Sequence, residues 1–554
     1  MNITDFLDKL DARQDMTPAV TAAIDACRLS GDKRLEFPQG RYHFWPDRAK
    51  EQYHFISNND EGLKRIAFLL QDLEDFEIVG DGSDFIFHGY ILPFVVNRSA
   101  NIRMRGFTID WARHFHSEAL VLESFEDGVG IEIPERYPYK IAHNRLVFTG
   151  EGSDRYEIGN ILEFDPQRRE TAFRVHDNYA IRDWHSAEEM GPGKVRFRAN
   201  FATRPTPGNV LAIMDGRRLC PTITLADSKD ITIEDITIHH SGGMGVIAQR
   251  TENIRIDSLR VTAREGTGGI ISATADATHF VSCAGEIVIE NCLFENQMDD
   301  ATNVHGIYGR ISAIISPTEV EYELVHEQQV GIDLFEAGDP LEIVSHTTLD
   351  TLQHNRIAGV NRLNKIYTRI TLESALPEDL KIKDVVANLR WTPNVTIRNC
   401  RSRGNRARGF LLTSGGRVLV ENNYFHIPGA AILIEGDANY WFESGAVNDV
   451  TIRGNHFDNC NYGVWGRATV EINGAVEPEY RECAIYHRNI RIDGNTFDDF
   501  NGLLLYAHCV DGLTFRQNVI RPSEEYPRVD ADKSKFDVEY CSNVEIDGNL
   551  FEGA

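Results

Sequence analysis

Long apolar segments and export signals are both missing from this sequence. No run of about 18 apolar residues occurs, which is roughly the length that a membrane-spanning helix requires. The N-terminus, MNITDFLDKLDARQDM, has no basic segment followed by an apolar one. We therefore expect no membrane partner, and a protein that is cytoplasmic as given, or secreted or periplasmic if a signal has been removed.

Cysteine is scarce and its spacing is irregular. The nine cysteines among 554 residues include none of the short paired spacings that mark zinc sites or disulfide frameworks. Most of them are therefore expected to be buried thiols.

Positive charge is also in short supply. The 57 lysines and arginines face 84 aspartates and glutamates, and the formal net charge is -27. Nucleic acid and anionic membranes would be repelled over most of such a surface. No nucleic-acid partner is expected, and a neutral substrate suits the charge balance better.

What the sequence does contain is a repeated strand segment. Its copies include FEIVGDGSDFIFHG from Phe76, NIRMRGFTIDW from Asn101, IVIENCLFEN from Ile287, NVTIRNCRSRG from Asn394, RVLVENNYFH from Arg417, DVTIRGNHFDN from Asp449, NIRIDGNTFDD from Asn489 and NVEIDGNLFEG from Asn543. Their first apolar residues are Ile78, Ile102, Ile231, Ile254, Ile287, Val395, Val418, Val450, Ile490, Leu513 and Val544. Several steps are 23 or 24 residues long, and others are 8 to 10 residues longer. This period predicts an all-β fold built on a right-handed parallel β-helix.

Two further columns are expected inside the coil. Five residues after the first apolar residue, the copies place Asn423, Asn455, Asn495, Asn518 and Asn549, with Cys292 and Cys400 in the same register. Stacked amides can satisfy one another and the backbone at the turn. Two residues further on, Phe294, Phe425, Phe457, Phe497 and Phe551 are expected to form an aromatic column.

Two steps are far too long for one coil, at 129 residues from Ile102 to Ile231 and 108 residues from Ile287 to Val395. Each must contain an insertion. The first includes LVFTGEG, NILEFDPQ, TAFRVHD, KVRFRANF and NVLAIMD, and the second includes GRISAIIS, EVEYELV, PLEIVS and YTRITLESAL. Their alternating patterns predict antiparallel β-domains of the barrel or sandwich type.

The expected organisation therefore has five parts. Before the first copy, a helix from Thr17 to Leu29 is predicted, with Thr17 as N-cap and Pro18 in its first turn. The parts are an N-terminal cap with the first rungs (1–117), an inserted β-domain (118–216), rungs that carry the catalytic aspartates (217–306), a second inserted β-domain (307–387) and the C-terminal rungs (388–554).

A repeated tripeptide places two aspartates together. Asp276-Ala277-Thr278 and Asp300-Ala301-Thr302 are 24 residues apart, about one coil. We expect Asp276 and Asp300 to stack about 4.8 Å apart, which raises one pKa unless a water or a hydroxyl is shared. Asp299 is offset by one residue and reaches the same cleft if it lies at a corner between sheets.

Three carboxylates on one surface are suited to inverting glycoside hydrolysis. This reaction needs a protonated acid and a base that holds a water, with the two carboxyl groups about 6.5 to 9.5 Å apart. A solvated polar turn and a calcium site of aspartate and asparagine oxygens are the alternatives. We favour hydrolysis and predict no metal.

The sequence resembles the α-1,3-galactosidases of glycoside hydrolase family 110. The resemblance lies in YHFWPD from Tyr42, FISNNDEGLKRIAF from Phe55, FIFHG from Phe85, TIDWARHFHSE from Thr108, DATHFVSC from Asp276, ENQMDDATNVHG from Glu295 and GDANYWFESGAV from Gly436. It implies a β-helix with inserted β-barrels and an inverting mechanism without a cofactor. The substrate it implies is a glycan with terminal α-1,3-linked galactose, and the catalytic aspartates it implies are Asp276, Asp299 and Asp300. Many relatives are exported, whereas no signal is visible here.

The geometry suggests how the three roles divide. Asp276 and Asp300, paired by the tripeptide, are placed to hold one water and should stay mainly ionised. Asp299 lies apart from them and is assigned as the general acid, with its pKa raised by the neighbouring negative charges.

Further polar and aromatic residues are candidates for binding the sugar. They lie in the resembling segments or near the same face of nearby rungs, where each is equally suited to a structural role. The candidates are His305, Asn303, His279, Arg408, Glu435, Trp441, Glu443 and Trp465. His114 and His116 would line the cleft or cap the first insertion.

Two other functions remain open at this point. Polygalacturonases also use one aspartate plus an adjacent pair on a β-helix, so a hydrolase or lyase acting on an acidic polysaccharide is one alternative, although the NTDG and RIK elements of that family are absent. A non-catalytic carbohydrate-binding β-helix is the other. The sheet edges and inserted domains would also allow a homodimer.

Overall fold

The structure is a computed structural model that describes residues 1–59, 61–151, 154–529 and 534–553. Asp60 and Gly152, which belong to two of the segments quoted above, lie outside the described residues. No helix within these described ranges is both long and apolar enough to cross a membrane.

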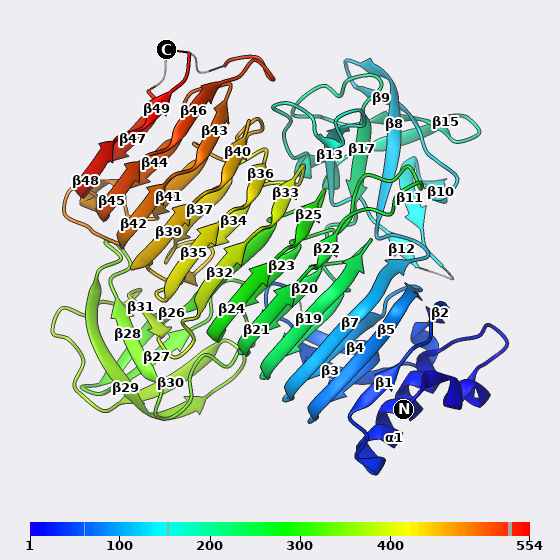
Figure 1. The fold of residues 1–554 in the computed structure, drawn as a ribbon, viewed down its shortest axis with the longest axis horizontal. Helices are drawn as coiled ribbons and strands as arrows, with labels where there is room; N and C mark the ends of the chain where they lie inside the picture. Colours follow the sequence, from blue (N-terminus) through cyan, green and yellow to red (C-terminus); the bar gives the residue numbers. More distant parts are fainter. Residues whose placement is uncertain (60, 152–153, 530–533, 554) are drawn as a thin grey trace.

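A right-handed parallel β-helix forms the body of the molecule, as the repeat predicts (Figure 1). One long sheet contains, along the coil axis, β5 (Glu74–Phe87), β7 (Ala100–Trp111), β19 (Lys229–Ile238), β21 (Glu252–Asp257), β24 (Ala284–Glu290), β32 (Asn394–Arg398), β35 (Arg417–Glu421), β39 (Asp449–Arg453), β42 (His487–Asp493), β45 (Val510–Arg516) and β48 (Ser542–Asp547). The same sheet includes β1 (Arg34–Glu36) and β2 (Arg41–Phe44), which pair with β5, and the short strands β22 (Arg260–Val261), β25 (Leu293–Glu295), β33 (Arg401–Arg403), β36 (Tyr424–His426), β40 (His456–Asp458), β43 (Thr496–Asp499), β46 (Val519–Pro522) and β49 (Leu550–Phe551).

A second long row of strands lies beside the predicted catalytic aspartates, which come just before β23 and β26. It contains β4 (Glu61–Gln71), β6 (Leu92–Asn97), β18 (Ile223–Ala226), β20 (Val246–Gln249), β23 (Thr278–Val281), β26 (Thr302–Ser316), β34 (Phe410–Leu412), β37 (Ile432–Gly436), β41 (Val470–Gly474), β44 (Leu505–His508) and β47 (Phe536–Glu539). Neighbours in this row are parallel, and β3 (Lys50–Phe55) adds an antiparallel strand beside β4.

The register of the first sheet follows the repeat closely. The first apolar residues pair in parallel from Ile102 onward, and Ile287 pairs with Val395 across the second insertion. The coil is therefore continuous on both sides of that insertion. The first predicted step is wrong: Ile102 pairs with Phe76 rather than Ile78, because the pairing shifts between Val79 and Ser83.

The predicted asparagine column is confirmed. Asn455 illustrates the pattern: its backbone N–H and its Nδ2 both donate to Oδ1 of Asn495, at 2.9 and 3.0 Å, and its Nδ2 also donates to the Val420 carbonyl at 3.0 Å. The column ends at the backbone N–H of Cys400, which donates to Oδ1 of Asn423. Like amides can stack because each one both donates and accepts.

The aromatic column is confirmed from Phe425 to Phe497 and is interrupted on both sides. The prediction is wrong for Phe551, because Ile520 lies between Phe497 and Phe551 in the ladder and Phe551 is 40% exposed. Phe457 stacks on Phe425 and Phe497, with ring centroids 5.1 and 4.7 Å apart. Ser402 lies between Phe294 and Phe425 in the ladder, so Phe294 is separated from the column.

The N-terminal helix covers the first coils. It runs over α1 (Thr17–Ser30) and follows the 3₁₀ helix η1 (Ile3–Lys9). Its N-cap is Met16 and not Thr17 as predicted, because the Met16 carbonyl already accepts the first bond of the helix, from the Val20 N–H at 2.9 Å. The predicted inner face, including Val20 and Ile24, is buried.

The first insertion is a seven-stranded antiparallel sheet with a small three-stranded sheet beside it. The larger sheet has the order β14 (Glu170–Thr171), β13 (Asn160–Asp165), β17 (Val210–Met214), β8 (His116–Phe125), β9 (Gly128–Glu132), β16 (Lys194–Arg198) and β15 (Ser186–Gly191), and the smaller one contains β10 (Tyr139–Ala142), β11 (Arg145–Thr149) and β12 (Arg155–Tyr156). The predicted strand in TAFRVHD is wrong beyond Thr171. The chain leaves the sheet there, and Asp177 pairs with Arg406 of the coil.

The second insertion is a closed antiparallel barrel. Around the barrel the strands pair in the order β26, β27 (Glu319–Glu323), β30 (Tyr367–Leu372), β29 (Thr351–Arg362), β28 (Pro340–Val344) and β31 (Val385–Asn388), which returns to β26. β29 was not expected from the sequence. β26 belongs to both parts, so one strand leads from the coil directly into the barrel.

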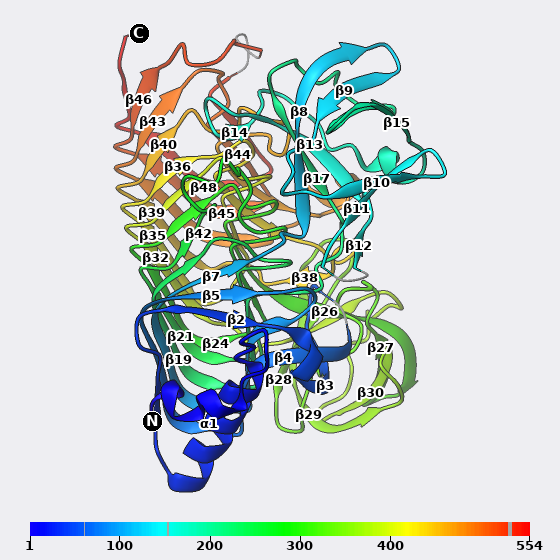
Figure 2. The ribbon, with the colours of Figure 1, turned by 90° about the vertical axis from the view of Figure 1, so that its right-hand side faces the viewer.

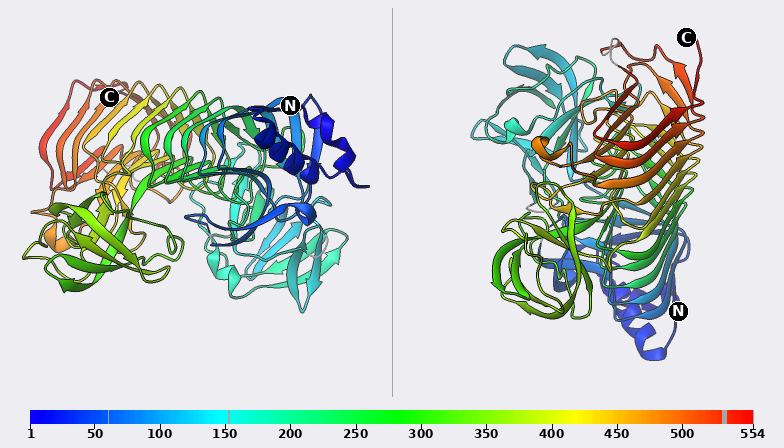
Figure 3. Two further views of the ribbon diagram at one scale, coloured as in Figure 1. Left: turned by 90° about the horizontal axis from the view of Figure 1, so that it is seen from below. Right: turned by 90° about the vertical axis from the view of Figure 1, so that its left-hand side faces the viewer.

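Both inserted domains lie on the same side of the coil. Figure 2 and Figure 3 show them side by side along one flank, while the opposite flank is the smooth stack of rungs. Two separate parts of the chain are therefore available to enclose a site on this flank.

Candidate active site

A pocket of about 370 Å³ lies where the coil meets both inserted domains. The residues that line it come from β23, β26 and β34 and the corners before them, and from the segment that runs from β37 to β41. Both insertions, the segment after the first insertion and the turn after β3 supply the others. All the sequence-predicted site residues except His305 line this pocket, namely Asp276, His279, Asp299, Asp300, Asn303, Arg408, Glu435, Trp441, Glu443 and Trp465.

Strand register brings Asp276, Asp300 and Arg408 into one column. Thr278 pairs with Thr302, and Thr302 pairs with Phe410, so the residues two positions earlier in each strand are neighbours. The Ala277 N–H donates to the Asp300 carbonyl at 3.0 Å, which continues the ladder into the corner. The stacking of Asp276 on Asp300 agrees with the repeated tripeptide.

Arg408 binds Asp300 through three donors. Its Nε donates to Oδ1 at 2.9 Å, its Nη2 donates to Oδ2 at 2.8 Å, and its backbone N–H donates to Oδ1 at 3.2 Å. This two-pronged geometry is the strongest way for a side chain to hold a carboxylate in place. Asp300 is thus fixed as one wall of the pocket.

Asp299 points to a different set of partners. Arg218 Nη2 donates to its Oδ2 at 2.6 Å and Arg406 Nη1 donates to its Oδ1 at 3.2 Å. Arg406 also binds Asp177 of the first insertion, at 2.9 Å. The Asp299 side chain is 15% exposed, whereas those of Asp276 and Asp300 are 3% and 2% exposed. Asp299 therefore lies nearer the opening, and the other two lie deeper.

The three carboxyl groups differ in their affinity for protons. Burial raises the pKa of Asp276 to about 7, and the charge of Asp299 adds to this effect. Burial also raises the pKa of Asp300 to about 7 against the opposing charge of Arg408. For Asp299 the effect of burial is outweighed by Arg406 and Arg218, and its pKa lies below the usual value. The expectation that neighbouring negative charges raise the pKa of Asp299 is therefore wrong, because sequence alone did not place two arginines beside it. The expectation that Asp276 and Asp300 stay mainly ionised is also wrong, because burial raises the pKa of both to about 7.

Two histidines lie behind Asp276. His279 Nδ1 is 2.5 Å from Asp276 Oδ2, and His279 Nε2 is 2.9 Å from His305 Nε2. His305 Nδ1 donates to the Gly306 carbonyl at 2.8 Å, and His305 Nε2 is 3.6 Å from Glu443 Oε1. His305 does not line the pocket. It contacts His279, which lines the pocket, and it is therefore not placed for the predicted contact with a sugar.

The remaining predicted residues provide polar atoms and an aromatic face. Trp441 is 41% exposed and lines the pocket, and the Trp465 Nε1–H donates to Asp177 at 2.9 Å. The buried Oδ1 of Asn303 accepts no hydrogen bond from any residue that the structure describes. Burial raises the pKa of both Glu435 and Glu443. These groups would suit a neutral ligand with many hydroxyls.

Several lining residues were missed by the sequence interpretation. Tyr179 comes from the 3₁₀ helix η3 (Tyr179–Arg182) within the first insertion, and Arg218 comes from the segment just after that insertion. Gln328 comes from the second insertion, and Asn58 comes from the turn after β3. These segments have no repeat that would place them in register with the aspartates. Arg406 was the one with a visible signal, because it lies two residues before Arg408 in the same corner.

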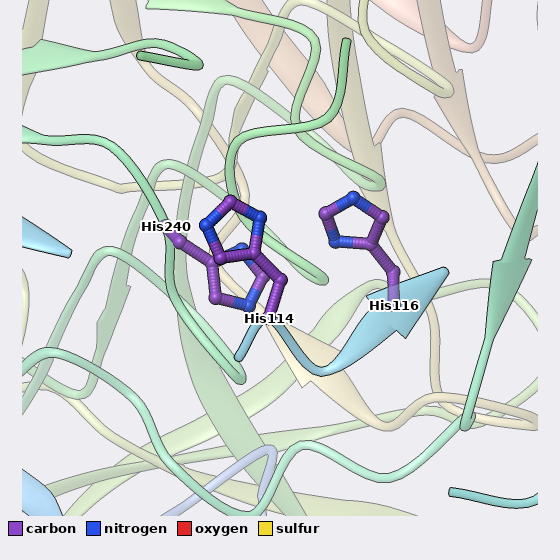
Figure 4. Close-up of side chains that lie close together, drawn as sticks. All are labelled: His114, His116 and His240. Carbon is purple, nitrogen blue, oxygen red and sulfur yellow. The ribbon is translucent and has the colours of Figure 1, made fainter. Parts of the chain in front are cut away.

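His114 and His116 do not line the pocket and lie at the start of the first insertion. They approach His240 closely enough for the three to be considered as metal ligands (Figure 4). However, His240 Nδ1 donates to the Ser272 carbonyl and His240 Nε2 accepts from the Phe115 N–H, so both of its ring nitrogens are engaged. The rings instead pack together, with His114 stacked on His240 at a centroid distance of 4.2 Å.

Three family models match parts of the chain. The GLAA-B beta-barrel domain I matches residues 117–211, the GLAA-B beta-barrel domain II matches residues 319–386, and the right handed beta helix region matches residues 394–554. The two barrel models thus fall on the two insertions.

Two curated relatives match over 91% of their length. The chain is 38% identical over 556 residues to alpha-1,3-galactosidase A of Shewanella woodyi, covering 100% of this chain and 91% of the relative. It is 34% identical over 562 residues to alpha-1,3-galactosidase B of Bacteroides thetaiotaomicron, with coverage of 100% and 91%. Among solved structures, an exopolygalacturonase from Thermotoga maritima gives a TM-score of 0.46 at 12% identity, with coverage of 100% of this chain and 92% of that chain. The Streptococcus pneumoniae surface protein and adhesin PfbA gives 0.46 at 11%, with coverage of 100% and 97%.

Proposed function

The chain belongs to the α-1,3-galactosidase family, and from this premise we propose that it is an exo-acting, inverting glycoside hydrolase that releases terminal α-1,3-linked galactose from glycans. The observation that carries the proposal is one pocket in which Asp276, Asp299 and Asp300 meet. No cofactor is required, because the acid and the base are both side chains.

Exo action is supported by the walls of the pocket. Tyr179 and Gln328 come from different insertions and close the flank of the coil from two directions. A volume of about 370 Å³ lies at the small end of ligand pockets and suits a chain end better than the middle of a polymer. The exposed face of Trp441 would stack on the sugar, and the unpaired Oδ1 of Asn303 would accept a bond from a hydroxyl.

The depth of the carboxyl groups supports a division of roles. In an exo enzyme the leaving group faces the opening, so the acid belongs nearer the opening, and the attacking water belongs on the opposite side of the sugar. Asp299 is the least buried of the three and is assigned as the acid, whereas Asp276 and Asp300 hold the water. The water oxygen then bonds to the anomeric carbon, the glycosidic bond breaks, Asp299 gives its proton to the leaving oxygen, and the deeper pair takes a proton from the water.

The pKa order of the three groups fits the end of this cycle. A single displacement leaves the base protonated and the acid ionised, and the higher proton affinity lies with Asp276 and Asp300. Asp299 must recover a proton before the next turnover. We propose that this reloading depends on substrate taking over hydrogen bonds of Arg218 and Arg406.

An acidic polysaccharide is less well suited to the pocket. Among the described residues that line it, each arginine already pairs with a carboxylate: Arg408 with Asp300, and Arg218 and Arg406 with Asp299. A uronate carboxylate would therefore meet no uncompensated positive charge. Polygalacturonate serves as the comparison substrate in the assay.

The test combines activity, stereochemistry and one variant. We expect hydrolysis of nitrophenyl α-galactoside and of an α-1,3-linked galactosyl oligosaccharide, no cleavage of polygalacturonate, and β-galactose as the first anomer in proton NMR. Asp299→Asn should slow the oligosaccharide about 10²-fold or more and the activated aryl galactoside far less, since an activated leaving group needs little protonation. Appearance of α-galactose first, or equal slowing of both substrates by Asp299→Asn, would overturn the inverting scheme or the identity of the acid.

A further inference from the structure

Two buried histidines that do not take part in the proposed displacement form a chain with Asp276. His279 lies in β23 and His305 lies in the neighbouring strand β26, and their rings meet edge to face with centroids 5.1 Å apart. Both side chains are about 2% exposed. Burial lowers the pKa of His279 to about 3 and also lowers the pKa of His305, so two neutral imidazoles are expected here.

The acceptor at the far end of the chain sets the direction of every bond. A carbonyl oxygen cannot donate, so the proton of neutral His305 must lie on Nδ1, which faces the Gly306 oxygen. His305 Nε2 is then an acceptor, and His279 must donate to it from Nε2. His279 Nδ1 is left without a proton, facing Asp276 Oδ2 at 2.5 Å.

The chain therefore holds one proton more than its imidazoles supply. Three hydrogen bonds need three protons, and two neutral histidines provide two. The third belongs to the contact between Asp276 and His279. Whether this proton lies on Asp276 or on His279, the pair is neutral overall. Because buried His279 is a weak base, the proton lies on the Asp276 carboxyl group.

We propose that His279 and His305 are positioning residues that direct a proton onto Asp276 and so set the pH below which the base of the hydrolase is blocked. The inference rests on the proposed function for the role of Asp276, but not for the location of the proton. A carboxylate that must release a proton from a complete hydrogen-bonded chain becomes active at a higher pH than one that faces an N–H donor.

Other charged groups around the chain act in both directions. Asp299 and Asp300 favour the proton on Asp276, whereas Arg218 and Arg408 oppose it. Glu443 and His326 act on His305 from the other side. None of these groups supplies a hydrogen bond to either imidazole that would reverse the chain.

His305→Gln is the variant that separates this role from a structural one. The amide at position 305 can donate to His279, which allows His279 to move its proton to Nδ1 and to donate to the Asp276 carboxylate. The acidic limb of the kcat/KM profile should then move down by about one pH unit, while the rate on the plateau changes only a few-fold. His354→Gln, on the exposed surface of the second insertion, is the matched control and should leave the profile unchanged.

Nitrogen NMR of wild-type protein with isotope-labelled histidine tests the hydrogen-bonded chain from Asp276 to Gly306 without any measurement of activity. We expect the Nδ1–H tautomer for His305 and the Nε2–H tautomer for His279, both persisting below pH 6. A doubly protonated His279, or the opposite tautomers, would overturn the assignment of the proton. Loss of rate in His305→Gln with both limbs unmoved, or movement of the alkaline limb alone, would overturn the link to a base. If no galactoside is hydrolysed, the proposed function fails, while the tautomers still decide where the proton lies.

Discussion

Two columns of the same coil stack side chains under the same geometry and reach opposite results. In the C-terminal rungs, Asn423, Asn455, Asn495, Asn518 and Asn549 stack amide on amide, and each donates to the next. In the central rungs, Asp276 stacks toward Asp300 and then Arg408. The amides of the first column bond to one another and to the backbone, whereas the carboxylates of the second column cannot bond to one another without a proton.

The difference follows from hydrogen-bonding capacity. An amide has two donors and one acceptor atom, so a stack of identical amides can bond indefinitely, whereas an ionised carboxylate only accepts. A carboxylate stack must therefore end on a cation or take up protons, and here it does both: Arg408 binds Asp300, and the pKa of Asp276 rises to about 7. Repetition stabilises the coil where the side chain both donates and accepts hydrogen bonds, and it places like charges together where the side chain only accepts.

The largest expected effect on turnover comes from replacing the stacked aspartates, Asp276 and Asp300, by the asparagines of the other column. Asp300→Asn and Asp276→Asn should each lower kcat about 10³-fold or more on both aryl and oligosaccharide substrates, because the proton acceptor for the water is removed. Circular dichroism should show an intact fold. Steady-state rates of these two variants and of Asp299→Asn on both substrates distinguish the base from the acid. If a variant retains a tenth of wild-type turnover, the aspartate that it replaces is not part of the base.

The reverse exchange should break the asparagine column. Asn455→Asp removes the Nδ2 donor to Val420 and places a buried charge against the Oδ1 of Asn495. We expect a loss of about 3 kcal/mol in the free energy of unfolding, with activity retained in the folded protein. Urea denaturation checks this, with Asn455→Ala as the variant that lacks the charge. Equal stability of Asn455→Asp and wild type would show that the column tolerates carboxylates.

A smaller, pH-dependent effect should distinguish Asp276 from a neutral side chain. Its pKa is about 7 in the folded protein against 3.8 for the free group, so the unfolded chain alone is ionised between pH 4 and 7. The contribution of this group to folding is therefore lost as pH rises through that window. The stability of Asp276→Asn relative to wild type should rise by roughly 2 kcal/mol from pH 5 to pH 8. Thermal unfolding at both pH values checks the sign, and a flat difference would contradict the raised pKa.

The smallest effect is expected where the asparagine column ends in thiols. Cys292 and Cys400 are buried, and their Sγ atoms lie 3.1 and 3.3 Å from backbone carbonyls. Replacement of either by Ala should cost roughly 1 to 2 kcal/mol through a small cavity, with turnover nearly unchanged. Denaturation and rate measurements on the same preparations test both halves. Loss of turnover at full stability would mean that a thiol takes part in the chemistry.

The coil and part of its site could be predicted because they depend on local repetition. A period of 23 to 24 residues places Ile254 on Ile231 and Asp300 near Asp276 without any knowledge of distant contacts. It failed at Ile78, where a shift in pairing changes the partner without changing the pattern of apolar residues. It also failed after Thr171, where apolar alternation was mistaken for a strand.

By itself the sequence determined the rungs, the asparagine column and the stacking of Asp276 near Asp300, since these follow from side chains that recur at a fixed spacing. The two insertions followed from the two steps that break this spacing. Only the tertiary structure decided that Arg218 and Arg406 flank Asp299, that Tyr179 and Gln328 enclose the pocket, and that His305 lies behind Asp276 rather than against a sugar. The charge state of each aspartate depends on groups within a few ångströms that are tens to more than a hundred residues away in the chain. Such distances are set by how the insertions fold back on the coil, and no local period encodes them.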